Sequence, residues 1–113
     1  MNDLVRMTAR EAVRRLAARE VSPLELIDAA VERIAEIDGA VNALPTLAVE
    51  RAREHAARLT ASGPPADAPP GYLHGLPFAA KDLKDVAGVR STTGSPIYAA
   101  NEPERSECLG EIV

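Results

Sequence analysis

Residues 73–82 read Leu-His-Gly-Leu-Pro-Phe-Ala-Ala-Lys-Asp, and this stretch decides how the fold of the chain is interpreted. Its centre, Leu76 to Ala80, is a short apolar run without polar alternation, which is typical of a strand buried on both faces. The run stops abruptly at Lys81 and Asp82. Charged groups that follow a buried strand are a common location for catalytic residues in α/β proteins, so we expect a strand that ends at a functional lysine.

Two amphipathic helices are predicted upstream of this stretch, and each has a capping-box pattern at its start. The paired residues are Thr8 with Glu11 and Ser22 with Glu25. After the second start, apolar residues recur at spacings of three and four, as a buried helix face requires. This stripe consists of Leu24, Ile27, Val31, Ile34 and Ile37. We expect the second helix to end near Gly39, because glycine readily adopts the left-handed conformation that closes helices.

Three further segments complete the secondary-structure prediction. Residues 41–47 are apolar but contain Pro45, which restricts them to an edge strand or an extended segment. A third helix is expected over residues 48–59. Ser106 is a candidate N-cap for a last helix over residues 107–113, which the end of the sequence would cut after about two turns. We therefore expect this chain to be one part of a longer protein.

The composition limits the classes of function. The chain has 113 residues with 13 basic and 17 acidic side chains, which give a net charge of −4. A surface that follows nucleic-acid phosphates normally needs clustered Lys and Arg, so direct nucleic-acid binding is disfavoured. The single cysteine, Cys108, suits a reducing compartment, and no apolar stretch is long enough for a signal peptide or a membrane helix. These features predict a cytoplasmic protein without a membrane partner.

Lys81 is the first candidate for chemistry. As an ordinary residue at a strand end it would be a surface lysine. Held against buried surface it would lose hydration, and its neutral amine would then serve as a base. Asp82 and Asp85 would oppose this second role if they lay close, because a carboxylate favours the ammonium form. As a metal site the two aspartates lack a histidine or third ligand nearby, which favours a role in orienting Lys81 or capping a turn.

Other potential nucleophiles have weaker support in the sequence. The loop after residue 90 carries four hydroxyl side chains, namely Ser91, Thr92, Thr93 and Ser95. No G-x-S-x-G elbow surrounds them, so loop hydrogen bonding is favoured over a nucleophilic role. Cys108 would need His55 or His74 as its base. Nothing in the sequence marks the thiol as activated, which favours an inert, partly buried cysteine.

The region from residue 73 onward resembles the first conserved block of the amidase-signature family. The family pattern is approximately L-x-G-[IL]-P-x-x-[VA]-K-D-x-x-D-V-x-G, followed by T-T-x-G-S. Residues 73–88 follow the first part, and residues 92–95 follow the second part with one residue fewer. The helix start at Ser22 and the segment Val41-Asn42-Ala43 are also similar to the family, so the resemblance covers essentially the whole chain.

This resemblance implies a fold. Members of the family have an α/β/α layer structure, in which a mixed sheet is flanked by helices. The present chain would be the N-terminal fragment of that single α/β domain, over residues 1–113, with helices plus a few strands. Residues 1–61 would be mainly helical, residues 62–71 a proline-rich loop, and residues 72–113 the strand and loop that carry the Lys-Asp block.

The resemblance also implies an activity, the hydrolysis of carboxylic amide C–N bonds by a Ser–cis-Ser–Lys set. Lys81 matches the lysine of that set, whose implied role is to take a proton from a bridging serine that in turn activates the nucleophilic serine. A glycine- and serine-rich segment similar to G-G-S-S-G-G-S carries both serines in the family and does not occur before Val113. The chain would therefore supply only the lysine, and we expect it to be inactive alone. The implied partner of the full-length protein is a small-molecule amide substrate, with no cofactor and no metal.

Two other functions remain open at this stage. The same block occurs in the A subunit of transfer-RNA-dependent amidotransferases, which releases ammonia from glutamine for the amidation of a mischarged transfer RNA. A truncated remnant with unpartnered apolar helix stripes would instead be non-catalytic and would bind a partner protein. The sequence gives no indication of oligomeric state.

Overall fold

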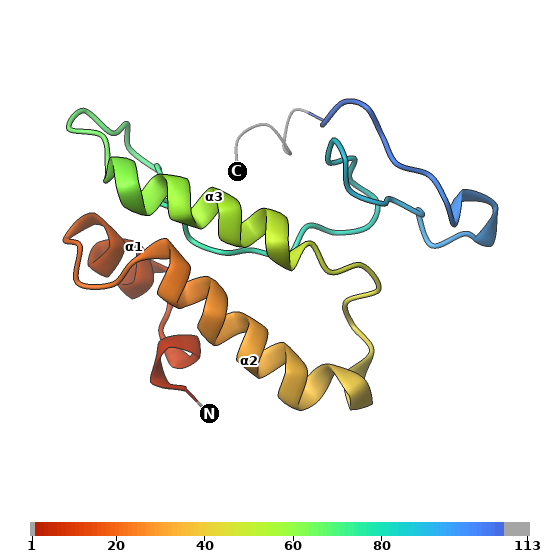
Figure 1. The fold of residues 1–113 in the computed structure, drawn as a ribbon, viewed down its shortest axis with the longest axis horizontal. Coiled ribbons are helices and arrows are strands. Elements are labelled where there is room, and N and C mark those ends of the chain that lie inside the picture. Colours follow the sequence, from red (N-terminus) through yellow and green to blue (C-terminus); the bar gives the residue numbers. More distant parts are fainter. Residues whose placement is uncertain (1, 108–113) are drawn as a thin grey trace. The chain divides into compact units, whose positions relative to one another are not determined.

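The computed structural model describes residues 2–107, in which helices are joined by irregular segments (Figure 1). In chain order the elements are η1 (Asp3–Arg6), α1 (Ala9–Ala17), α2 (Pro23–Val41), α3 (Val49–Ser62) and η2 (Pro96–Tyr98), where η denotes a short 3-10 helix. The chain divides into two compact units between Pro77 and Phe78. We refer to residues 2–77 as the helical unit and to residues 78–107 as the loop unit.

Side chains fix the starts of α1 and α2, as the sequence predicted. At the start of α1, Thr8 Oγ1 accepts a hydrogen bond from Glu11 N at 3.2 Å. At the start of α2, Ser22 Oγ accepts from Glu25 N at 3.2 Å, and Glu25 Oε2 accepts in return from Ser22 N at 2.8 Å. Pro23 occupies the first helical position, where the chain needs no N–H donor. Local sequence therefore determines where these helices begin.

The predicted end of α2 near Gly39 is wrong, because the helix continues to Val41. Asn42 takes the left-handed conformation, with φ 52° and ψ 46°, and its N–H donates to the carbonyl of Asp38. The carboxylate of Asp38 also accepts from Ala43 N at 2.8 Å, which satisfies a backbone donor beyond the helix. Asparagine tolerates the left-handed region better than most residues, so the helix ends there and Gly39 stays helical.

The core of the helical unit is small and is built around α1 and the start of α2. Its buried residues are Ala12, Leu16, Val21 and Leu26, against which Leu4, Met7 and Leu76 pack. α3 packs along α2 and runs back in the opposite direction (Figure 1). Each of these two helices contributes a buried alanine, Ala29 in α2 and Ala56 in α3. Because alanine buries little area, this core gives the unit modest hydrophobic stabilisation.

The prediction of an α/β fragment, with a few strands from a mixed sheet, is wrong for the described chain. Residues 2–107 contain no strand. The apolar run Leu76 to Ala80 forms no hydrogen-bonded ladder with another segment of that range, and Phe78 is 57% exposed. Residues 42–47 are irregular as well. A strand exists only through backbone bonds to a neighbour, and a short apolar run does not by itself supply that neighbour.

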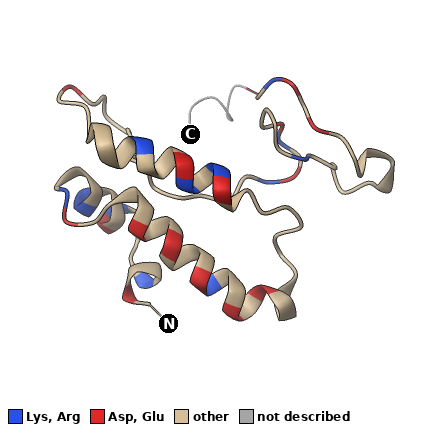
Figure 2. Ribbon diagram, in the orientation of Figure 1, with Lys and Arg blue, Asp and Glu red and all other residues tan. Residues whose placement is uncertain are grey.

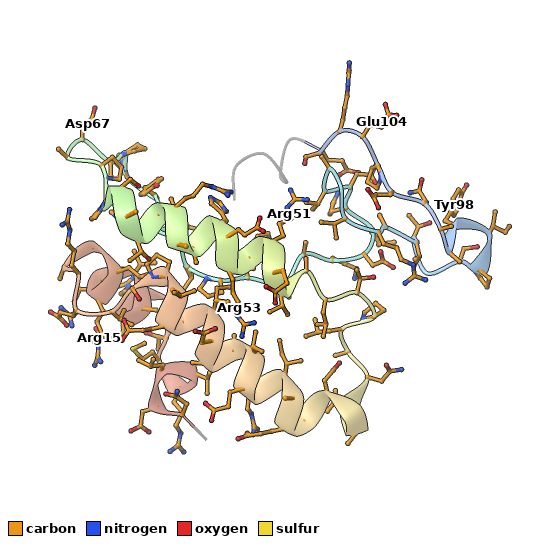
Figure 3. All side chains as sticks on the ribbon, in the orientation of Figure 1. Arg15, Arg51, Arg53, Asp67, Tyr98 and Glu104 are labelled. Atoms are coloured by element: carbon orange, nitrogen blue, oxygen red, sulfur yellow. The ribbon has the colours of Figure 1, made fainter. Side chains whose placement is uncertain are left out.

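Acidic and basic residues both occur along the helices (Figure 2). Arg14 lies between two carboxylates and is 2.9 Å from both Glu11 and Glu20. Arg53 extends from α3 toward α2, where its Nε is 2.9 Å from Asp28 Oδ1 (Figure 3). Exposed pairs of this kind contribute about 0–1 kcal/mol each, so they add to a fold that the helix caps and the core determine.

The helical unit should lose stability in acid. Hydrogen bonds from Arg14 and Arg15 lower the pKa of Glu11 from 4.5 to about 2. The backbone N–H and hydroxyl of Ser22 likewise lower the pKa of Glu25. A depressed carboxyl pKa stabilises the fold above its unfolded value, and this contribution is lost as the pH falls through the folded value. The guanidinium chloride concentration at the unfolding midpoint should therefore decrease as the pH is lowered from about 4.5 to about 2.

A double variant, Glu11→Gln with Glu25→Gln, is the control for this acid sensitivity. Its amides do not titrate, so its midpoint should change less than that of the wild type over the same pH range. Equal losses in the two proteins would show that other carboxyl groups are responsible.

Candidate functional site

Lys81 lies in the loop unit, where it is exposed. Of the ion pairs within residues 2–107, none involves Lys81. The neighbouring Lys84, by contrast, has its Nζ 3.3 Å from Glu107 Oε2. The carbonyl of Lys81 accepts from Lys84 N at 2.9 Å, which closes a turn directly after the candidate lysine. Lys81 is thus an exposed lysine without a carboxylate partner in the described chain, and residues 2–107 do not hold it against buried surface, the environment that the sequence analysis linked to a base.

The carboxylate of Asp82 is bound by Thr92 rather than by Lys81. Asp82 Oδ1 accepts from Thr92 N at 2.8 Å, and Oδ2 accepts from the Thr92 hydroxyl. These bonds, the hydroxyl first, lower the pKa of Asp82 and keep it ionised. The Asp82 carboxylate is therefore bound within the loop unit and is not paired with Lys81.

The hydroxyl-rich loop is held by hydrogen bonds, as the sequence favoured. Ser91 is 2% exposed, and its hydroxyl donates to the carbonyl of Asp82 at 3.2 Å. Thr93 N donates to the same carbonyl at 3.2 Å. The Thr92 hydroxyl accepts in addition from Gly94 N at 3.2 Å. Among the described residues no hydrogen bond joins these hydroxyls to Lys81, so the geometry marks them as structural groups.

A second set of bonds aligns residues 85–91 antiparallel to residues 101–107. Ser91 and Asn101 exchange two bonds, from Ser91 N to the Asn101 carbonyl at 3.0 Å and from Asn101 Nδ2 to the Ser91 carbonyl at 2.9 Å. Further out, Gly88 N donates to the Pro103 carbonyl and Glu107 N to the Asp85 carbonyl, both at 3.0 Å. The spacing is too irregular for a regular strand pair. Sequence reasoning missed Asn101, because a single asparagine in a loop carries no recognisable pattern.

Ser106 takes part in the same alignment. Its hydroxyl accepts a hydrogen bond from Ala87 N at 2.9 Å. The helix that we predicted after Ser106 lies outside the described residues, apart from Glu107. In the described chain Ser106 therefore joins two segments of the loop unit.

The Lys81 segment falls inside a known family pattern, since residues 25–109 match the family model for Amidase. The chain belongs to the amidase-signature family. It is 40% identical over 97 residues to the A subunit of the glutamyl-tRNA(Gln) amidotransferase from Nocardia farcinica (strain IFM 10152), a match that covers 86% of this chain and 20% of that relative. It is 34% identical over 110 residues to an amidase of Pseudomonas putida, a match that covers 93% of this chain and 23% of the relative.

This chain matches only a part of the length of each of these relatives. A third relative, the A subunit of the glutamyl-tRNA(Gln) amidotransferase from Azotobacter vinelandii (strain DJ / ATCC BAA-1303), is 40% identical over 112 residues, or 93% of this chain and 23% of the relative. The chain thus spans about a fifth to a quarter of the length of the curated relatives it matches. No solved structure gives a match. The family resemblance read from the sequence is confirmed.

Gly75, the first glycine of the family block over residues 73–88, lies in the helical unit and has a steric role. Its φ is +87°, a conformation that side-chain-bearing residues rarely adopt. A Cβ at this position would lie 2.7 Å from Pro23 Cγ and 3.1 Å from Leu59 Cδ1. Gly75 therefore lets the chain around it in the helical unit approach the start of α2 and the side of α3 closely.

Gly75→Ala should destabilise the helical unit by more than Gly71→Ala does. Gly71 has a nearly equal φ of +85°, but a Cβ there would meet no atom within 4 Å. Both variants carry the backbone strain, and only Gly75→Ala adds the clash with Pro23. The difference in unfolding free energy, measured by urea titration, should be about 1–3 kcal/mol. Equal losses would mean that the packing around Gly75 relaxes freely.

A pocket of about 200 Å³ lies within the helical unit. Its lining residues are Leu16, Arg19, Val21, Ser22, Pro23, Glu25, Leu59, Thr60, Gly63, Pro64, Tyr72 and His74. His74 packs edge-on against Tyr72, with ring centroids 4.8 Å apart, and its buried Nδ1 has no hydrogen-bond partner within the described chain. His55 is exposed on α3. The alternative pairing of Cys108 with either histidine falls on a residue outside the described range.

Two other site types were considered from the sequence. Over residues 2–107 no group of three or more His, Cys, Asp or Glu side chains is arranged to hold a metal ion. None of the helices in that part of the chain is long and apolar enough to cross a membrane. The Lys81 segment, which lies within the part of the chain that matches the family model, is the candidate site.

Proposed function

We propose that this chain is the lysine-bearing segment of an amidase that hydrolyses carboxylic amide C–N bonds, with Lys81 as its general base. The observation that supports this most directly is the contrast between two adjacent residues. Lys81 occupies the lysine position of the family block and is exposed with no carboxylate partner in the described chain, whereas the Asp82 carboxylate accepts hydrogen bonds from Thr92, and the backbone of Gly94 also favours its ionised form. Because Asp82 is held by Thr92 and not by Lys81, the Lys81 nitrogen is available to contact a bridging serine.

The proposed reaction proceeds in two halves. The neutral amine of Lys81 takes a proton from a bridging serine, which takes one from the nucleophilic serine as that oxygen attacks the amide carbon. The C–N bond then breaks, the leaving nitrogen receives the proton, and an acyl-serine remains. Water attacks this ester with Lys81 again as base, which releases the carboxylic acid and regenerates the serine. The serine-rich segment is not among these 113 residues, so the segment alone should be inactive.

A second candidate function is the A subunit of a transfer-RNA-dependent amidotransferase. Its support is the name of relatives such as those of Nocardia farcinica and Azotobacter vinelandii, which are 40% identical to this chain, against 34% for the Pseudomonas putida amidase. In this case the amide is glutamine, and the ammonia is passed on rather than lost to water. Partner subunits and transfer RNA would then be needed for full activity.

One experiment tests both candidates. The protein is purified as its source cell makes it, its intact mass is determined, and ammonia release is measured from small amides and from glutamine. We expect a mass well above the 12.0 kDa of this chain and hydrolysis of small amides. Activity restricted to glutamine and dependent on partner subunits would favour the amidotransferase. A product of 12.0 kDa that releases no ammonia would contradict both proposals and favour a non-catalytic role.

A further inference from the structure

We propose that Thr92 is a positioning residue for Lys81, and that it acts by binding both oxygens of the adjacent Asp82 carboxylate. This inference rests on the proposed function, in which Lys81 is the base. Thr92 has two effects on the base. It fixes the backbone next to Lys81, and it holds a carboxylate that would otherwise pair with the ammonium of Lys81.

The contact between Asp82 and the loop is extensive for a single residue. The backbone N–H of Thr92 donates to Oδ1 at 2.8 Å, and its hydroxyl donates to Oδ2. The Asp82 carbonyl is bound as well, by Thr93 N and by the buried hydroxyl of Ser91, each at 3.2 Å. Both the side chain and the main chain of Asp82 are therefore fixed, and Lys81 is attached to a residue with little freedom to move.

Asp82 is the carboxylate directly beside Lys81 in the chain, and other charged side chains lie in the same part of the loop unit. The other ionisable side chains of this part of the loop unit are Lys84, Asp85, Arg90 and Glu107. Lys84 and Glu107 pair with each other at 3.3 Å. Arg90 acts on Asp82 as a nearby positive charge that favours its ionised form. Asp82 is thus an ionised group directly beside Lys81 in the chain, and its orientation determines whether the two charges meet.

Releasing the carboxylate would impair the base. An unbound Asp82 carboxylate would be attracted to the Lys81 ammonium, since opposite charges a few ångströms apart favour the charged forms of both groups. A protonated amine cannot accept a proton from serine. By binding the carboxylate, Thr92 keeps it from pairing with the Lys81 nitrogen.

The test compares Thr92→Val with Thr92→Ser in the complete protein as its source cell makes it, with ammonia release recorded as a function of pH. Valine keeps the size of threonine and lacks the hydroxyl, whereas serine keeps the hydroxyl. Thr92→Val should lower kcat about 10-fold with KM changed less than about threefold, and should move the acid limb of the kcat profile upward by about one pH unit. Thr92→Ser should have nearly the kcat of the wild type, with the acid limb of its kcat profile at the wild-type pH.

Two further variants serve as controls. Thr93→Val makes the same chemical change one residue later, where the hydroxyl donates to the Thr92 carbonyl at 2.7 Å and does not touch Asp82. It should leave the acid limb in place. Asp82→Asn keeps the shape of the side chain and removes its charge, so it should not move the limb upward. This variant also provides the answer if Thr92→Val does not fold, because an upward shift in Asp82→Asn overturns the proposal.

The outcomes separate this inference from the proposed function. A folded Thr92→Val protein with an unchanged acid limb overturns the positioning role, and so does an equal loss in Thr92→Ser. If Lys81→Ala retains full activity, Lys81 is not the base and both proposals fail. If Lys81→Ala is inactive while Thr92→Val behaves as the wild type, the base is supported and only the role of Thr92 is wrong.

Discussion

Replacing Lys81 with alanine should slow amide hydrolysis by the complete protein about 10²- to 10⁴-fold, with little effect on its stability. The rate should fall because no other group would take the proton from the bridging serine at neutral pH. Stability should hold because Lys81 is exposed and forms no ion pair within residues 2–107. Steady-state ammonia release and the thermal unfolding midpoint, measured on the same preparation, would check both statements.

Lys84→Ala is the matched control for this experiment. It removes the same type of side chain three residues later, together with an exposed pair to Glu107 at 3.3 Å that contributes about 0–1 kcal/mol. Its activity should stay within about threefold of the wild type, since a surface ion pair has no part in proton transfer. Comparable losses in the two variants would mean that the loop unit tolerates no change there, and that the effect of Lys81→Ala is not specific.

Replacing Leu26 with alanine should have the largest effect on folding, a loss of about 2–5 kcal/mol in the free energy of unfolding. Leu26 is 6% exposed and joins α2 to the cluster that contains Leu16 and Val21. This cluster is small and rich in alanine, so few other side chains can move to fill the resulting cavity. Because a small domain has only a few kcal/mol in total, a large fraction of the variant should be unfolded at 25 °C.

Leu47→Ala separates this effect from a general intolerance of leucine loss. Leu47 is 53% exposed in the irregular segment before α3, so its truncation should cost less than about 0.5 kcal/mol. Far-ultraviolet circular dichroism during urea titration reports helix content in both variants. If the midpoints of the two variants coincide, the core assigned to the helical unit is incorrect.

The accuracy of the sequence predictions depended on how far apart the interacting residues are along the sequence. The helix starts at Thr8 and Ser22 were predicted correctly, because each cap involves residues three positions apart. The end of α2 was misplaced because two residue types compete to close a helix, and Asn42 closes it with help from Asp38. The predicted strand was wrong for a different reason. Its apolar pattern describes a buried environment, whereas strand formation depends on a pairing partner elsewhere in the chain.

The candidate site was predictable in part. The block around Lys81 is recognisable because its residues are contiguous and their spacing is specific to one family. The contacts of Asp82 with Thr92 and of Ser91 with Asn101 span ten residues each and follow no periodic pattern. Which hydroxyl of the loop binds the carboxylate depends on how the chain turns between the two positions. The sequence therefore predicted Lys81 as a candidate, and only the structure showed which residues hold the neighbouring Asp82.

The bonds that align residues 85–91 with residues 101–107 are nested, and nesting imposes an order on folding. The contact of Ser91 with Asn101 closes the shortest of these loops, and the contact of Asp85 with Glu107 closes a longer one around it. The entropic cost of closing a loop grows with its length, and a closed inner loop shortens the outer one. The contact between Ser91 and Asn101 should therefore form first, and the contact between Asp85 and Glu107 should form last. The contact of Asn101 with Ser91 would then determine how quickly these two segments close.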